Sequence, residues 1–154
     1  TGSAGWSASV HVCLVEVDLE TGLVAIPQFS VFEDCGPLIN PAVVDGQIRG
    51  GVLQGISTVL FERLVYDDEG TVLTGSYMDY LLPTSMEAPT VEIHHVDCGP
   101  EAIPRDHRGV GEGGMIGAPV ALVNAIEDAL RSRNVTITES HLPPARILEL
   151  AGVI

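Results

Sequence analysis

The chain has 154 residues, a hydrophobic fraction of 45% and a mean hydropathy of +0.30, which exclude a disordered segment and suffice for one domain with its own core. The formal net charge is −14 and all seven basic residues are Arg, so the field has the wrong sign for nucleic acid or an anionic membrane surface. No apolar run approaches the roughly 18 residues that span a bilayer. We therefore expect a single folded domain over 1–154, without nucleic-acid or membrane partners.

The three cysteines, Cys13, Cys35 and Cys98, lie far apart in the sequence. None belongs to a CxxC or Cys/His spacing typical of zinc or iron–sulfur sites, so we expect no side chain of this chain to ligate a metal directly. Their number and spacing favour free thiols in a reduced, cytoplasmic compartment.

The first elements form a predicted β-hairpin. Residues 10–18 are rich in β-branched side chains and read as a strand, 20–22 as a turn, and 23–32 as a second extended run. Pro27 lacks a backbone N–H, so it must lie at a sheet edge or in a bulge.

A glycine-rich helix is predicted near 42–62. Asn40-Pro41 is a helix-start signal, and apolar residues then recur at helical spacing. Four glycines interrupt this helix, and each costs about 1 kcal/mol relative to Ala in a helix interior. Close approach of a partner backbone or of a ligand would explain them; they are Gly46, Gly50, Gly51 and Gly55.

The remaining elements alternate without a regular βαβ rhythm. The sequence predicts a short hairpin (64–66 with 71–73), a strand (90–96), a loop (97–109), an amphipathic helix near 117–133, a last strand (135–138) and a short helix (144–150). This order favours an α+β fold with a mixed sheet. Asp-Cys-Gly-Pro occurs at both 34–37 and 97–100, without further similarity between the flanks, and is interpreted as coincidence.

Residues 109–114, Gly-Val-Gly-Glu-Gly-Gly, match the dinucleotide pattern GxGxxG. The fingerprint must follow a buried strand, whereas the preceding residues carry Pro and several charges, and the absence of Lys excludes a Walker phosphate loop. Glu112 is then a lone carboxylate in a glycine-rich loop. It is either a solvated loop residue or a positioned base beside a bulky ligand, and the residues alone do not choose between them.

Two further pairs of polar residues have open interpretations. Gln47 and Gln54 are seven apart in the predicted helix and fall on nearly the same face, either as exposed side chains or as amides that bind a polar cofactor. His94 and His95 are adjacent on a predicted strand, so their side chains point to opposite faces and cannot chelate one ion together.

The ordered set of motifs resembles the large subunit of the xanthine oxidase family of molybdenum hydroxylases, which includes aldehyde oxidases and carbon monoxide dehydrogenases. The resemblance runs from about residue 10 to about 150, and its last motifs are most similar to the carbon monoxide dehydrogenase-like branch. It suggests the C-terminal portion of a molybdopterin-binding domain. The motifs are Val-Glu-Val-Asp (15–18), Asp-Cys-Gly (34–36) with Asn-Pro (40–41), Gly-Gln (46–47), Gly-Ser-Tyr-Met-Asp-Tyr (75–80), and the run 109–119.

This resemblance implies a role for each candidate residue. Glu112 would be the catalytic base, taking a proton from water or hydroxyl at the metal, or orienting the substrate. Gln47 would hydrogen-bond the pterin, while the backbone of Gly111, Gly113 and Gly114 would let the loop pass close beneath the metal. Arg108 stands where the family usually has Lys, so the positive charge is kept.

The resemblance also implies cofactors and partners. The chain would share a molybdenum–molybdopterin cofactor, in its cytosine dinucleotide form, with the remainder of a much longer large subunit. FAD would lie on a medium subunit and [2Fe–2S] clusters on a small one, and a small-molecule carbon would be oxidised with water as oxygen donor. Alone, this segment is expected to be inactive. The alternative is a stand-alone binding or scaffold domain that kept the fold without the chemistry.

Overall fold

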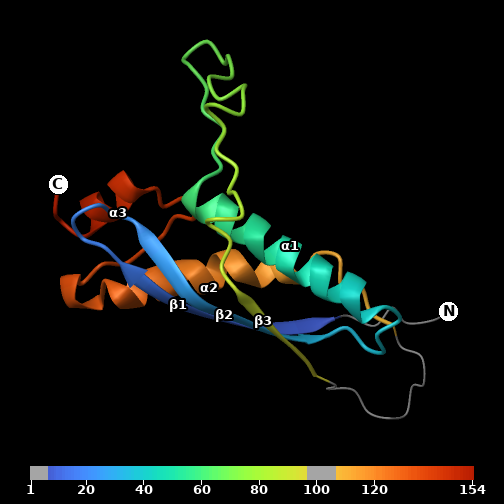
Figure 1. Cartoon of the computed structure of the whole chain (residues 1–154). Helices are drawn as coiled ribbons and strands as arrows, with labels where there is room; N and C mark the ends of the chain where they lie inside the picture. The colour runs from blue at the N-terminus through green and yellow to red at the C-terminus, as the bar shows by residue number, and fades with distance from the viewer. Residues whose placement is uncertain (1–6, 97–106) are drawn as a thin grey trace.

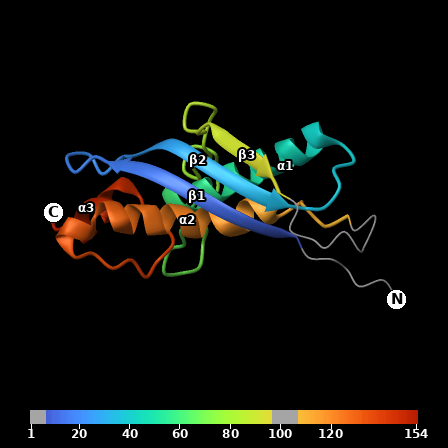
Figure 2. The same cartoon turned by 90° about the horizontal axis from the view of Figure 1, so that it is seen from below.

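The computed structural model describes residues 7–96 and 107–154, which form a three-stranded sheet covered on one face by two long helices (Figures 1 and 2). The mixed α+β prediction is confirmed. In chain order the elements are β1 (Ala8–Val17), β2 (Val24–Asp34), α1 (Pro41–Leu60), β3 (Val91–His95), α2 (Gly113–Ala129), a 3₁₀ turn η1 (Arg131–Arg133) and α3 (Pro144–Leu150).

The sheet is mixed, in the order β1-β2-β3. β1 and β2 form the predicted antiparallel hairpin, whereas β2 and β3 are parallel. Leu14 faces Gln28 and Glu16 faces Ala25, so one residue of β1 opposes two of β2, and Pro27 is one of those two. Of the two positions expected for Pro27, a sheet edge or a bulge, the register places it in the irregular, bulged part of β2. β3 does not extend far enough to need its missing N–H.

Strand alternation turns one face of the sheet toward the helices. Phe29 and Val31 of β2 are fully buried there, against apolar side chains of both helices. No described helix covers the opposite face, and Val10, Val12 and Leu14 of β1 are each more than half exposed on it. The helical members of the core are Ile48, Val52, Ile56 and Val59 of α1 and Ala118, Leu122 and Ile126 of α2.

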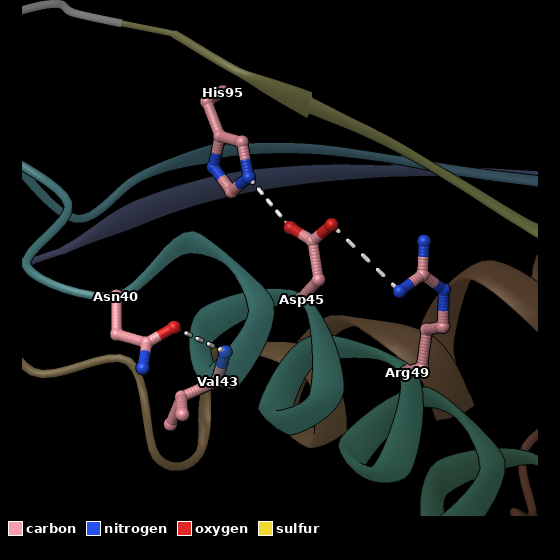
Figure 3. A network of polar contacts seen from close by, with 5 residues as sticks. All are labelled: Asn40, Val43, Asp45, Arg49 and His95. Atoms are coloured by element: carbon pink, nitrogen blue, oxygen red, sulfur yellow. Dashed lines mark hydrogen bonds and ion pairs between the residues drawn. The ribbon is translucent and has the colours of Figure 1, made fainter.

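Helix α1 starts as the sequence predicts, because the Asn40 side chain accepts a hydrogen bond from the Val43 N–H at 3.3 Å (Figure 3). Two of its glycines face α2. A Cβ on Gly51 would lie 2.9 Å from the backbone nitrogen of Met115, and one on Gly55 would lie 2.7 Å from the Ala118 Cβ. Close approach of α2 therefore explains both residues, through its backbone at Gly51 and through side chains at Gly55. No described atom lies within 4 Å of a Cβ on Gly46 or Gly50.

Helix α2 begins at Gly113, earlier than the predicted start near 117, and ends at Ala129 before the short turn η1. Glycine is a weak helix former, so the sequence pattern assigned Gly113 and Gly114 to a loop. Tertiary contacts override this preference, as described below for the site.

The strand predicted over 135–138 is wrong: these residues form no strand. Their apolar side chains, Val135 and Ile137, pack against the core, which accounts for the strand-like pattern. The Ile137 N–H donates to the Glu127 carboxylate at 2.6 Å instead of to a neighbouring strand.

The segment between α1 and β3 projects away from the two layers (Figure 1). Its predicted short hairpin is confirmed as a single antiparallel bridge between Tyr66 and Val72. Within the described ranges, no helix is long and apolar enough to cross a membrane. Cys98, most of the predicted 97–109 loop and the second Asp-Cys-Gly-Pro lie outside the described residues.

Candidate cofactor-binding and catalytic site

The glycine loop 109–114 is held at its start by the end of β2. The Arg108 guanidinium forms an ion pair with the Asp34 carboxylate at 2.5 Å, and the Arg108 N–H donates to the Cys35 carbonyl at 3.0 Å. The Asp34 side chain is 1% exposed and that of Arg108 15%, so this pair is largely removed from solvent. A buried pair with a matched backbone bond fixes the entry of the loop more firmly than a surface pair would.

The end of the loop packs against β2 and α1 through glycines. A Cβ on Gly114 would run into the carbonyl of Ile48, and a Cβ on Gly113 would lie 2.8 Å from Oε1 of Glu33. A larger residue at Gly114 would meet fixed backbone, whereas one at Gly113 would have to displace the Glu33 carboxyl. These close contacts let α2 begin here. Gly111 differs, because no described atom lies within 4 Å of the Cβ it lacks.

Glu112 occupies the N-cap position of α2, with φ −118° and ψ −7°. Its carbonyl accepts the N–H groups of Met115 and Ile116 at 3.0 and 3.1 Å, but its side chain makes no capping bond and is exposed. The residues that normally cap a helix with their side chains are Asn, Asp, Ser and Thr, and the longer Glu is not among them. Here the backbone of Glu112 is fixed while its carboxylate stays available to a ligand.

Gln47 is exposed on α1, directly before the residue that touches Gly114, and it makes no hydrogen bond to a described residue. It is flanked by the uncovered Gly46, with Gly50 one turn further along. Gln54 is also exposed and lies two turns along the same helix. Gln47 and Glu112 thus come from two elements that touch each other, and both point polar groups away from the core.

The two histidines of β3 face opposite sides, as predicted. The His94 ring stacks on Phe32 with centroids 4.6 Å apart, whereas the His95 Nε2 lies 2.8 Å from an Asp45 oxygen of α1 (Figure 3). Asp45 also contacts Arg49 at 3.7 Å. In the described part of the chain, no group of three or more His, Cys, Asp or Glu side chains is arranged to hold a metal ion.

Sequence reasoning missed two buried polar residues beneath the first turns of α2. Glu33 is 1% exposed, and both of its oxygens are buried without completing a hydrogen bond to a described residue. The His11 ring lies under Gly117, where a Cβ would come within 2.5 Å of it, and its nitrogens are also unpartnered among these residues. Strand parity held the signal for Glu33, because it lies two residues after Val31 and four after Phe29 and so shares their buried face of β2.

Burial shifts the titration of both groups. It raises the pKa of Glu33, an effect that the charge of neighbouring Asp34 increases and His95 opposes. It lowers the pKa of His11, against a smaller opposing effect of the Gly113 backbone. Both shifts favour the neutral form of the side chain.

A groove of about 660 Å³ lies between α2 and residues 137–141. Its lining includes Arg63, Val123 and His141, but neither Glu112 nor Gln47. The candidate residues therefore stand on the surface around the α1–α2 contact, outside this groove.

Comparison with known proteins identifies the family of this chain. Residues 1–89 match the family model of the molybdopterin cofactor-binding domain. The large subunit of nicotine 6-hydroxylase from Paenarthrobacter nicotinovorans is 41% identical over 145 residues, which cover 94% of this chain and 18% of that protein.

Two solved structures share the fold. Quinoline 2-oxidoreductase from Pseudomonas putida 86 matches with a TM-score of 0.86 and 40% identity, over 92% of this chain and 18% of that one. Reconstituted CO dehydrogenase from Oligotropha carboxidovorans matches with a TM-score of 0.88 and 28% identity, over 95% and 18%. The chain belongs to the molybdopterin cofactor-binding domains of the molybdenum hydroxylase (xanthine oxidase) family, and it spans about a fifth of the length of these relatives.

Proposed function

We propose that this chain supplies one side of the active site of a molybdenum hydroxylase, with Glu112 as the catalytic base. The observation that supports this role is the uncommitted Glu112 carboxylate, exposed at the N-cap of α2 on a loop that is held at both ends. A solvated loop residue needs no such support. An acid or base works only when its backbone is fixed and its side chain is free to reach the reacting proton.

The residues around Glu112 fit a bulky polar cofactor. The exposed Gln47 amide offers both a donor and an acceptor, and Gly46, Gly50 and Gly111 leave the neighbouring backbone uncovered by side chains. A molybdenum–molybdopterin group, when bound, would supply a redox metal that takes electrons from the substrate carbon while water supplies the oxygen. Gln47 would hold the pterin, the glycines would permit its approach, and Glu112 would accept a proton.

The substrate class follows from the relatives only by analogy. The two relatives with the higher identities are named for nicotine and quinoline, and the CO dehydrogenase has a lower identity. We therefore place a heterocyclic carbon before CO as the substrate. The rest of the large subunit, an FAD subunit and a [2Fe–2S] subunit would complete a cytoplasmic enzyme, with the cofactor in its cytosine dinucleotide form.

The first test replaces Glu112 by Gln in the complete enzyme. Glu112→Gln should lower kcat by about 10²–10⁴-fold, the usual contribution of a positioned base, with molybdenum content unchanged. Turnover would be measured with an N-heterocycle and with CO. Glu16→Gln is the matched control, because Glu16 is exposed on the far face of the sheet, and it should keep wild-type kcat. Near-normal turnover of Glu112→Gln would refute the assignment.

The second test concerns cofactor binding. Gln47→Ala should reduce the molybdopterin that is released on denaturation, because the amide contact is lost. Gln54→Ala removes the same group two turns along the same helix and should retain the wild-type content. Equal cofactor content in the two variants would contradict the role of Gln47.

A further inference from the structure

Glu33 is a buried acid directly beneath the candidate catalytic loop. It is the penultimate residue of β2, and its two carboxyl oxygens would lie 2.8 and 3.0 Å from a Cβ on Gly113, the first residue of α2. The side chain is 1% exposed, yet neither oxygen completes a hydrogen bond to a described residue. A buried acid of this kind is costly to folding, so a role is expected for it.

The groups that face Glu33 do not neutralise it. Ser9 of β1 and His95 of β3 are its register partners across the sheet, and the Ser9 hydroxyl favours the anion only slightly. His95 is already engaged with Asp45 of α1.

The two other charged or titratable neighbours are engaged or neutral. Asp34, the next residue, is paired with Arg108. His11 of β1, on the same sheet face beneath α2, has a pKa lowered by burial. The charge of His95 favours an ionised Glu33, but His95 is shared with Asp45, and burial outweighs its effect.

Glu33 contacts the N-terminus of α2 without forming a hydrogen bond to it. Its first turn presents free N–H groups and a partial positive charge, and the Glu112 side chain does not cap them. Glu33 reaches the same turn from the sheet side, through Gly113. The two acids thus flank one helix terminus, the first exposed and the second buried.

We propose that Glu33 is a positioning residue for Glu112: it supports the first turn of α2 from below and so holds the backbone of Glu112 in place. This inference rests on the proposed function of Glu112. Loss of the Glu33 side chain would leave a void under Gly113, and the Glu112 backbone could settle into it. Small displacements of a catalytic group are costly, about 10²-fold for 1 Å.

The protonation state of Glu33 gives the proposal a signature of its own. Burial raises the pKa of Glu33, so the neutral acid is the form that the fold favours. Its support is fully present below the ordinary carboxyl range and is lost as pH rises through the raised pKa. Glu33→Gln has the shape of the neutral acid and cannot ionise, so it should keep this support at every pH.

The test compares Glu33→Ala, Glu33→Gln and the exposed control Glu16→Gln in the complete, assembled enzyme. Glu33→Ala should lower kcat by about tenfold or more, while KM and molybdenum content per enzyme stay within about twofold. Glu33→Gln should restore the kcat that Glu33→Ala loses, and its kcat should decline less than that of the wild type as pH rises above the ordinary carboxyl range. Its unfolding temperature should also change less with rising pH, a readout that does not depend on activity.

Three results would overturn the inference. One is wild-type kcat in Glu33→Ala. Another is a loss of kcat that matches an equal loss of molybdenum, which indicates a structural role only. The last is a Glu33→Gln variant with the same pH dependence as the wild type in both kcat and unfolding temperature.

Measuring Glu112→Gln alongside separates this inference from the proposed function. Activity in Glu112→Gln would defeat the proposed function, and the positioning role with it. An inactive Glu112→Gln beside a fully active Glu33→Ala would defeat the positioning role alone.

Discussion

The two ends of the sheet–helix sandwich are built for different purposes. At one end the β1–β2 turn meets α3: the Asp18 carboxylate accepts bonds from the Glu20 N–H and the Thr21 hydroxyl, both at 2.8 Å, and Gly22 lies against the backbone of Pro144 (Figure 1). At the other end, where β2 stops and α2 begins, Glu33 and His11 are buried without completed hydrogen bonds to described residues.

We call the end with α3 the closed end and the end with Glu112 the site end. We expect the closed end to contribute mainly to stability and the site end mainly to the proposed function. Carboxylates at the closed end are used by the chain itself, and Ile147 of α3 is fully buried. At the other end, the Glu112 and Gln47 side chains are exposed and several glycines are uncovered, as the proposed cofactor site requires. Polar groups that lack hydrogen bonds within the chain are expected where a protein binds or reacts, and here they lie around the N-terminus of α2.

The largest stability effect should come from the closed end. Ile147→Ala removes a fully buried side chain and should cost about 2–5 kcal/mol of unfolding free energy, because a cavity is left in the core. Thermal or denaturant unfolding of the assembled enzyme would measure it. The kcat per bound molybdenum should not change, because α3 lies far along the fold from Glu112.

Val153→Ala is the control for this change, because Val153 is 44% exposed and its truncation should cost much less. A fall in kcat per molybdenum in Ile147→Ala would show that the two ends are coupled. The assignment of stability to one end and function to the other would then be wrong.

A smaller stability effect, with a larger functional one, is expected at the site end. Gly114→Ala places a methyl group against the Ile48 carbonyl and should destabilise the fold by about 1–3 kcal/mol through overpacking. Because it pushes α2 from α1 beside Glu112, it should also lower kcat per molybdenum.

Gly111→Ala is the matched control in the same loop, since no described atom meets its Cβ. In cofactor-free enzyme it should unfold at the wild-type temperature. Equal destabilisation by the two alanines would show that the loop, and not the contact with Ile48, limits stability.

Much of this fold could be predicted from local patterns. The alternating strands, the Asn40-Pro41 start of α1 and the bulge at Pro27 each follow from the chemistry of single residues. The parallel pairing of β3 with β2 could not be read, because it depends on a connection of more than fifty residues and has no turn motif.

Both errors have tertiary causes. Val135 and Ile137 alternate like a strand, but the Glu127 carboxylate takes the N–H that a neighbouring strand would have used. Gly113 and Gly114 are helical because their close packing against Glu33 and the Ile48 backbone outweighs the weak helix preference of glycine. Of the site, motifs could indicate Glu112 and Gln47, whereas the pairing of Glu33 with the α2 terminus required the three-dimensional register.

The Asp34–Arg108 ion pair, here called the clamp, holds the start of the glycine loop and affects how this chain folds. Asp34 and Arg108 are 74 positions apart, and the Ser30–Glu92 bond that joins β2 to β3 spans 62. Contacts of such long range form only after the entropy of closing large loops has been overcome, so they slow folding. We expect the β1–β2 hairpin and isolated helical turns to form early and the clamp to form last. The proposed site around Glu112 would therefore be completed only after the rest of the fold has formed.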